Sequence, residues 1–171
     1  MRVFVTGASG HIASAVIPEL LANGHQVVGL ARSEENVAAL EKLGAEVHRG
    51  SLQDLESLKR GAENADGVIH LAFIHDFSKF AENGQIDKRA IEAMGDVLEG
   101  TNKPFIVTSG VAMISPGEPA MEDMMRHQPG MPRMSEEAVF RFNDRGVRSM
   151  AVRLPAEFHF EGRKYLSVVT S

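Results

Sequence analysis

Three small residues stand between the first apolar run of the chain and its first helical pattern. Gly7, Gly10 and Ala13 follow the run at 3–5 and precede apolar residues spaced as one helix face. The first glycine permits a tight turn, the second lets the backbone approach a pyrophosphate, and the alanine lets helix and strand pack closely. A helix that begins here offers free N–H groups to phosphate oxygens. This spacing predicts a dinucleotide-binding loop in preference to an ordinary turn. The other residues that would line it are Ser9, His11 and Ile12.

The residues after the second apolar run, at 27–30, bear on which nicotinamide cofactor the loop binds. NAD-binding proteins place an acidic residue there for the ribose hydroxyls, whereas a cation there accommodates the 2′-phosphate of NADP. Ala31 occupies the acidic position, and Arg32 and Ser33 follow it. A guanidinium binds a phosphate through two N–H groups, although the acidic pair at 34–35 opposes an anion nearby. The sequence therefore predicts NADP rather than NAD. The alternative is that Arg32 is a solvated loop residue and Ser33 only a helix cap.

Short apolar runs alternate with amphipathic stretches along most of the chain. They predict strands at 3–5, 27–30, 46–49, 67–72, 105–108 and 150–154. Helices are expected between them, one capped by Ser51 or Asp54 and the last over 136–143. Strands that are apolar on both faces are typical of a parallel sheet covered by helices on both sides. We therefore predict an α/β fold, a doubly wound parallel sheet of about six strands (a Rossmann fold), in a single domain over 1–156.

Three stretches resemble one protein superfamily. TGASGHIA at 6–13 is similar to the TGxxGxxG/A signature of the extended and atypical short-chain dehydrogenases/reductases, which include the NAD-dependent epimerases/dehydratases. VIHLAF at 68–73 resembles the fourth strand of that family. RGVRSMAVRLPAEFH at 145–159 is similar to its sixth strand and the loop near the nicotinamide. The further cofactor contacts that this resemblance implies are Ser51, Leu52, Leu71, Ala72 and Phe73.

The catalytic residues typical of this family are absent from their usual places. Family members use a Ser or Thr after the fifth strand and a Tyr-x-x-x-Lys pair, in which the lysine lowers the pKa of the tyrosine. The one tyrosine of this sequence, Tyr165, has Val169 four residues on, so the sequence contains no such pair. Alignment places Arg133 at the tyrosine position and Glu137 at the lysine position, and Ser109 just before the serine position.

Two interpretations of this region remain open. In one, Ser109 and Arg133 form a changed active site. Arginine does not release its proton near neutral pH, so Arg133 would bind an anionic substrate or stabilise an oxyanion. In the other, Ser135 caps a helix, Glu136 and Glu137 occupy its first turn, and Arg133 is a surface residue. Ser109 and Arg133 are thus the candidate catalytic residues.

The composition of the chain argues against several kinds of binding site. A net charge of −5 argues against a general nucleic-acid surface. The absence of cysteine excludes disulfides and thiolate metal sites and fits a reducing compartment. No apolar run is long enough to span a membrane, and the seven histidines lack metal-ligand spacing, so we interpret them as structural or surface residues. We expect a cytoplasmic protein that binds no nucleic acid, membrane or metal.

A short tail at 157–171 follows the predicted sheet, where extended family members carry a substrate-binding lobe. The tail is predicted to form a hairpin or an added strand. Apolar surface and strand edges left open without that lobe need cover, so we expect a homo-oligomer, most simply a dimer. The Met- and Pro-rich segment at 111–134 is either a binding surface or a loop left over from a larger ancestor.

Three functions fit these observations. The first is an NADP(H)-binding oxidoreductase with a non-standard active site for a small carbonyl substrate. The second is a non-catalytic nicotinamide-cofactor sensor or interaction module. The third is a truncated, inactive relic.

Overall fold

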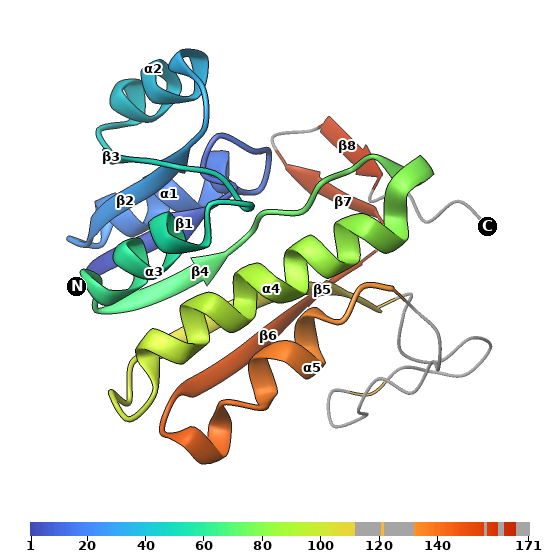
Figure 1. The fold of residues 1–171 in the computed structure, drawn as a ribbon. Coiled ribbons are helices and arrows are strands. Elements are labelled where there is room, and N and C mark those ends of the chain that lie inside the picture. Colours follow the sequence, from blue (N-terminus) through green and yellow to red (C-terminus); the bar gives the residue numbers. More distant parts are fainter. Residues whose placement is uncertain (112–120, 122–131, 156, 161–162, 167–171) are drawn as a thin grey trace.

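A computed structural model describes residues 1–111, 121, 132–155, 157–160 and 163–166 (Figure 1). Its main sheet has the strands β1 (Arg2–Thr6), β2 (Gln26–Ala31), β3 (Glu46–Arg49), β4 (Gly67–His70), β5 (Pro104–Gly110) and β6 (Arg148–Leu154). Their order in the sheet is β3-β2-β1-β4-β5-β6, and every neighbouring pair is parallel. This order is that of a doubly wound dinucleotide-binding sheet and confirms the predicted α/β fold class.

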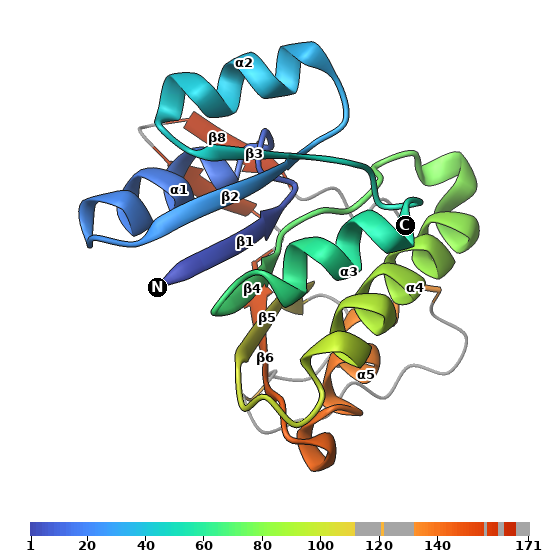
Figure 2. The same cartoon turned by 60° about the vertical axis from the view of Figure 1, so that its left-hand side comes forward.

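Helices cover both faces of this sheet, as Figure 2 shows from the side. The helices are α1 (Ala13–Ala22), α2 (Glu34–Leu43), α3 (Leu55–Glu63), α4 (Phe80–Leu98) and α5 (Ser135–Phe140). Val3 and Val5 pack with residues of α1 and α2, whereas Phe4, between them in β1, packs with residues of α3, α4 and α5. Because successive strand residues point to opposite faces, the continuous apolar run is what buries β1 on both sides.

Local capping chemistry sets where two of the helices begin. Ser33 holds the N-cap of α2 and accepts a hydrogen bond from the backbone N–H of Asn36. Asp54, and not Ser51, caps α3 by accepting from the N–H of Ser57. Each side-chain oxygen satisfies a backbone donor that has no partner within its helix.

The structure differs from the sequence prediction at two element ends. β4 ends at His70 instead of residue 72, because its neighbour β1 turns away at Gly7 after one last bond from the N–H of Leu71 to the carbonyl of Thr6. The helix predicted over 136–143 is the shorter α5, and a 3₁₀ turn (Asn143–Arg145) follows it.

Two further strands lie outside the main sheet. β7 (Glu157–Phe160) pairs antiparallel with β8 (Arg163–Leu166), so they form a two-stranded sheet of their own. Most of the Met- and Pro-rich segment, residues 112–120 and 122–131, lies outside the described residues.

Candidate functional site

The turn after β1 favours glycine both by its backbone conformation and by the space it leaves. Gly7 has a φ of +67°, in the left-handed region that side chains rarely adopt. A Cβ atom at Gly7 would lie 2.7 Å from the backbone nitrogen of Ala72, closer than the two can approach. The N–H of Gly10 donates to the carbonyl of Gly7 at 2.8 Å and closes the turn. The predicted phosphate loop is therefore a tight turn held directly against the segment that follows β4.

The helix that follows this loop begins with unpaired donors. Ile12 holds the N-cap of α1 without a side-chain hydrogen bond, and Ala13 is fully buried against the sheet. Within the described part of the chain, the N–H groups of Ile12 and Ala13 donate to no protein acceptor. The loop lies at the carboxyl end of β1, next to β4, where the strand order reverses (Figure 1). Ligands of doubly wound sheets bind at this switch point, and anions bind at such helix N-termini.

An exposed arginine follows β2 at the position that bears on cofactor choice. Arg32 is exposed and makes no hydrogen bond or ion pair with any residue that the structure describes. Ser33 uses its hydroxyl oxygen to cap α2, although this leaves the hydroxyl proton available. Arg49 binds both carboxylate oxygens of Glu34, at 2.6 and 2.9 Å, and holds the pKa of that carboxyl below its ordinary value. The negative charge of Glu34 would repel a phosphate bound at Arg32, and the positive charge of Arg49 offsets this repulsion.

The predicted cofactor contacts after β3 and β4 lie in the loops that follow the carboxyl ends of these strands. Ser51 accepts a bond from the N–H of Gln53 at 3.3 Å, and Leu52 packs at the border of the core. Leu71, Ala72 and Phe73 are all half-buried. The positions of these residues fit the lining of an elongated ligand that crosses the loop between β1 and β4.

A buried hydrogen-bonded chain begins just before the phosphate loop. The hydroxyl of Thr6, at the end of β1, lies 2.7 Å from Nδ1 of His70, at the end of β4. Nε2 of His70 lies 3.0 Å from one carboxylate oxygen of Asp87 in α4. All three side chains are buried. His70, expected to be a structural or surface residue, is thus a buried link between two sheet strands and a helix.

The second carboxylate oxygen of Asp87 continues this chain toward Arg133. The hydroxyl of Ser135 donates to Asp87 at 2.6 Å and accepts from Nε of Arg133 at 3.0 Å. Arg133 also donates through Nη2 to the carbonyl of Thr108 at 2.8 Å. Its guanidinium carbon lies 4.2 Å from the centre of the Phe73 ring, within cation–π range. Arg133 is therefore held from three sides beside the ends of β4 and β5.

This geometry contradicts two parts of the second interpretation, the cap and the surface arginine, although Glu136 and Glu137 do occupy the first turn of α5. Met134, and not Ser135, holds the N-cap of α5, and no side chain caps that helix. Arg133 is half-buried rather than a surface residue. Ser109, the second catalytic candidate, is buried on β5 next to Thr108. The structure thus brings both candidates to one end of β5.

A bidentate ion pair ties α5 to the edge strand β6. Arg153 donates to the two carboxylate oxygens of Glu136 at 3.0 and 2.8 Å, and Glu136 raises the pKa of the guanidinium. Glu136 is almost fully buried. The pair fixes the helix that carries Ser135 against the sheet.

The sequence contains one indication of the buried chain. Thr6, His70 and Asp87 each interrupt an otherwise apolar strand or helix face. A polar side chain at a buried position needs a hydrogen-bond partner. That rule predicts that partners exist, but it does not identify them.

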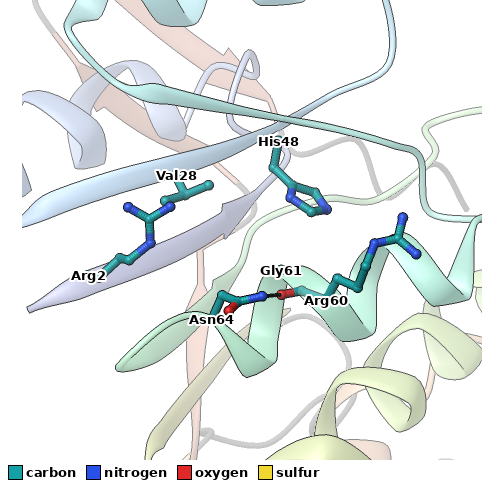
Figure 3. A pocket seen from close by; sticks show the side chains of 6 residues that line it. All are labelled: Arg2, Val28, His48, Arg60, Gly61 and Asn64. Carbon is teal, nitrogen blue, oxygen red and sulfur yellow. Dashed lines mark hydrogen bonds between the residues drawn. The ribbon is translucent and has the colours of Figure 1, made fainter.

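A hollow of about 370 Å³ lies elsewhere in the molecule (Figure 3). It is lined by Arg2, Val28, His48, Arg60, Gly61 and Asn64. Arg2 begins β1, whereas the phosphate loop follows the end of that strand. This hollow is therefore not part of the candidate cofactor site.

Metal binding and membrane insertion are two further possibilities. Across the residues with described positions, no group of three or more His, Asp or Glu side chains could hold a metal ion. None of the helices in that same part of the chain is both long and apolar enough to cross a bilayer.

Comparison with known proteins agrees with this arrangement. A family model described as NAD(P)H-binding matches residues 7–138. An uncharacterised protein of Schizosaccharomyces pombe is 47% identical over 95% of this chain and 56% of its own length. An uncharacterised protein of Saccharomyces cerevisiae is 45% identical over 96% and 56%. The chain thus spans a little over half the length of these relatives.

Solved structures share the fold at low sequence identity. Yeast methylglyoxal/isovaleraldehyde reductase complexed with NADPH has a TM-score of 0.68 at 20% identity, covering 91% of this chain and 58% of that one. UDP-glucose 4-epimerase of Thermotoga maritima has a TM-score of 0.72 at 21% identity, covering 90% and 55%. These neighbours belong to the superfamily that the sequence motifs resemble.

Proposed function

The chain belongs to the NAD(P)H-binding family, and from that premise we propose that it is an NADP(H)-dependent oxidoreductase acting on a small carbonyl compound. The observation that carries the proposal is the glycine turn at Gly7, packed on Ala72, followed by the N–H groups of Ile12 and Ala13, which have no acceptor among the described residues. These groups would hold the pyrophosphate. Two partial relatives support the carbonyl substrate: Aldehyde reductase 2 of Sporidiobolus salmonicolor and a quinoline-oxide ketoreductase of Stigmatella aurantiaca.

The preference for NADP over NAD rests on Arg32. The exposed guanidinium, which has no partner among the described residues, and the neighbouring hydroxyl of Ser33 support this preference, because a cation after the second strand accommodates a 2′-phosphate. Arg49 offsets the opposing charge of Glu34. Calorimetric titration with NADPH and NADH tests this assignment, because NADPH should bind more tightly.

The chemistry proposed for Arg133 is electrostatic. NADPH, held by the N–H groups of Ile12 and Ala13, would supply a hydride to the carbonyl carbon of the substrate and leave as NADP⁺, and water would supply the proton that converts the alkoxide to the alcohol. Arg133 keeps its own proton and stabilises the negative charge on the oxygen, while Ser109 lies at the same end of β5. Consumption of NADPH with a panel of aldehydes, ketones and quinones tests for this activity. Turnover should fall in Arg133→Ala and Ser109→Ala.

A non-catalytic cofactor-binding module is the second candidate function. Arg133 at the tyrosine position favours it, because the sequence has no Tyr-x-x-x-Lys pair to act as acid and base. The same experiments separate the candidates. Binding of NADPH without turnover of any carbonyl supports the module, and no binding of either nucleotide supports an inactive relic.

The proposed assembly is a homodimer formed through β6. This strand is an edge of the sheet, and Met150 and Val152 on it are 41% and 47% exposed. Apolar side chains on an open strand edge favour pairing with a second chain. Light scattering across micromolar concentrations would show twice the monomer mass, and a monomer at all of them would exclude the dimer. A chain without cysteine suits the cytoplasm, which cell fractionation would test.

A further inference from the structure

We propose that Asp87 and Ser135 are positioning residues that fix Arg133 at the proposed active site. Together with Thr6 and His70 they form one buried chain that begins beside the phosphate loop and ends at the guanidinium. The inference deepens the proposed function and rests on it, because Arg133 acts there on the oxygen of the substrate.

The side-chain types determine which group donates and which accepts in each hydrogen bond of the chain. The carboxylate of Asp87 only accepts, so Nε2 of His70 and the hydroxyl of Ser135 both donate to it. The oxygen of Ser135 is then free to accept from Nε of Arg133. In neutral His70, Nδ1 accepts from the hydroxyl of Thr6. All these groups are satisfied together, and a fully satisfied buried network holds its members in one arrangement.

Burial makes the chain rigid. Asp87 is 1% exposed, His70 is fully buried and Ser135 is 1% exposed. A carboxylate in such surroundings is costly without hydrogen-bond donors, so Asp87 binds its two donors firmly. Its negative charge also acts on Arg133 through the single intervening hydroxyl. The chain thus orients a cation without neutralising it by direct contact.

Helix α4 also positions the backbone that carries Arg133. Gly84 lies three residues before Asp87 on that helix, and a Cβ at Gly84 would collide with the carbonyl of Pro132. Residues three apart share one face of a helix. One face of α4 therefore contacts the segment at Pro132 and binds the side chain of Ser135, on either side of Arg133. Preorganised charges of this kind stabilise a transition state without reorganising during the reaction.

The test follows the Nε–H of Arg133 by NMR of the full ¹⁵N-labelled chain with NADPH present. Arg133→Lys identifies the resonance. We expect Ser135→Ala to abolish it through fast exchange with water, and Ser135→Thr, which keeps a hydroxyl, to retain it. Ser57→Ala is the matched control, because Ser57 is also a buried helical serine with a side-chain hydrogen bond but lies outside the chain. It should lower stability and leave the Arg133 signal in place.

A second variant tests Asp87 directly. In Asp87→Asn one of the two acceptor oxygens becomes an NH2 donor. If the amide nitrogen faces His70, Nε2 must accept and Nδ1 must donate to Thr6; if it faces Ser135, that hydroxyl must accept from the amide and can no longer donate to it. In the folded variant we expect one of two results: the ring ¹⁵N shifts of His70 exchange positions, or the Arg133 Nε–H signal shifts or disappears. An Arg133 signal that Ser135→Ala leaves unchanged, or a folded Asp87→Asn in which both the His70 tautomer and the Arg133 signal are unchanged, would overturn the proposal. The NADPH titration of each variant shows separately whether cofactor binding itself has failed.

Discussion

Replacing Gly7 by alanine separates the two reasons for glycine in the phosphate loop. The substitution places a β-carbon at a φ of +67°, which costs about 1–2 kcal/mol of strain for an ordinary residue. It also places that carbon 2.7 Å from the backbone nitrogen of Ala72, and overpacking of this kind costs about 1–3 kcal/mol. We expect Gly7→Ala to lower the free energy of unfolding by about 2–5 kcal/mol in urea denaturation.

Cofactor binding should suffer as well. Relief of the collision moves the loop away from Ala72 and turns the N–H groups at the start of α1 from their alignment. Each hydrogen bond to a charged phosphate contributes ~1.5–3 kcal/mol, so the Kd for NADPH should rise by about tenfold or more. Calorimetry at a temperature where the variant remains folded measures this change.

Gly24→Ala is the matched control. Gly24 has a φ of +76°, but nothing lies within 4 Å of a Cβ placed there. This variant should show the strain of about 1–2 kcal/mol and leave the Kd for NADPH unchanged. Equal losses of stability in the two variants, with NADPH bound as in the wild type by both, would refute the inference that the loop is fitted against Ala72.

Three further substitutions test other parts of the argument. In calorimetric titrations, Arg32→Ala should raise the Kd for NADPH about tenfold and leave the Kd for NADH unchanged. Arg60→Ala is the control: Arg60 is also exposed but lies near Arg2 at the other end of the sheet, so this variant should change neither Kd. Gly84→Ala should lower the free energy of unfolding by about 1–3 kcal/mol, because the added methyl group would collide with the carbonyl of Pro132. Alanine has the better helix propensity, so a variant that is more stable in thermal melts would contradict this expectation. Glu136→Gln should cost about 1.5–3 kcal/mol in urea denaturation by weakening the charged bonds to Arg153, and an unchanged midpoint would show that the pair contributes nothing.

Local sequence was sufficient for most of the framework. Strands such as β1 are apolar at successive positions, which itself indicates burial on both faces of a parallel sheet. Ser33 and Asp54 start helices through bonds to residues three positions on, so their effect is readable from the sequence alone. The phosphate loop is equally local, because a turn and the helix start after it depend on a few adjacent residues.

The ends of elements depended on their neighbours in space. β4 ends at His70 because the chain turns away from it at Gly7, which lies 63 positions earlier in the sequence. The apolar run at 68–73 by itself gives no indication of where this pairing ends. The hydrogen bond of Ser135 likewise depends on a residue that is distant in the sequence. A serine that precedes acidic residues is a good helix cap by sequence alone. In the folded chain, however, the hydroxyl of Ser135 donates a hydrogen bond to the carboxylate of Asp87.

The sequence by itself thus determined a doubly wound sheet with a dinucleotide loop, because these features arise from periodicity and short-range hydrogen bonds. The tertiary structure alone decided which polar groups meet. Thr6 and His70 are 64 residues apart, and Asp87 and Ser135 are 48 apart. Their pairing follows from strand order and helix packing, and no pattern within one segment encodes either.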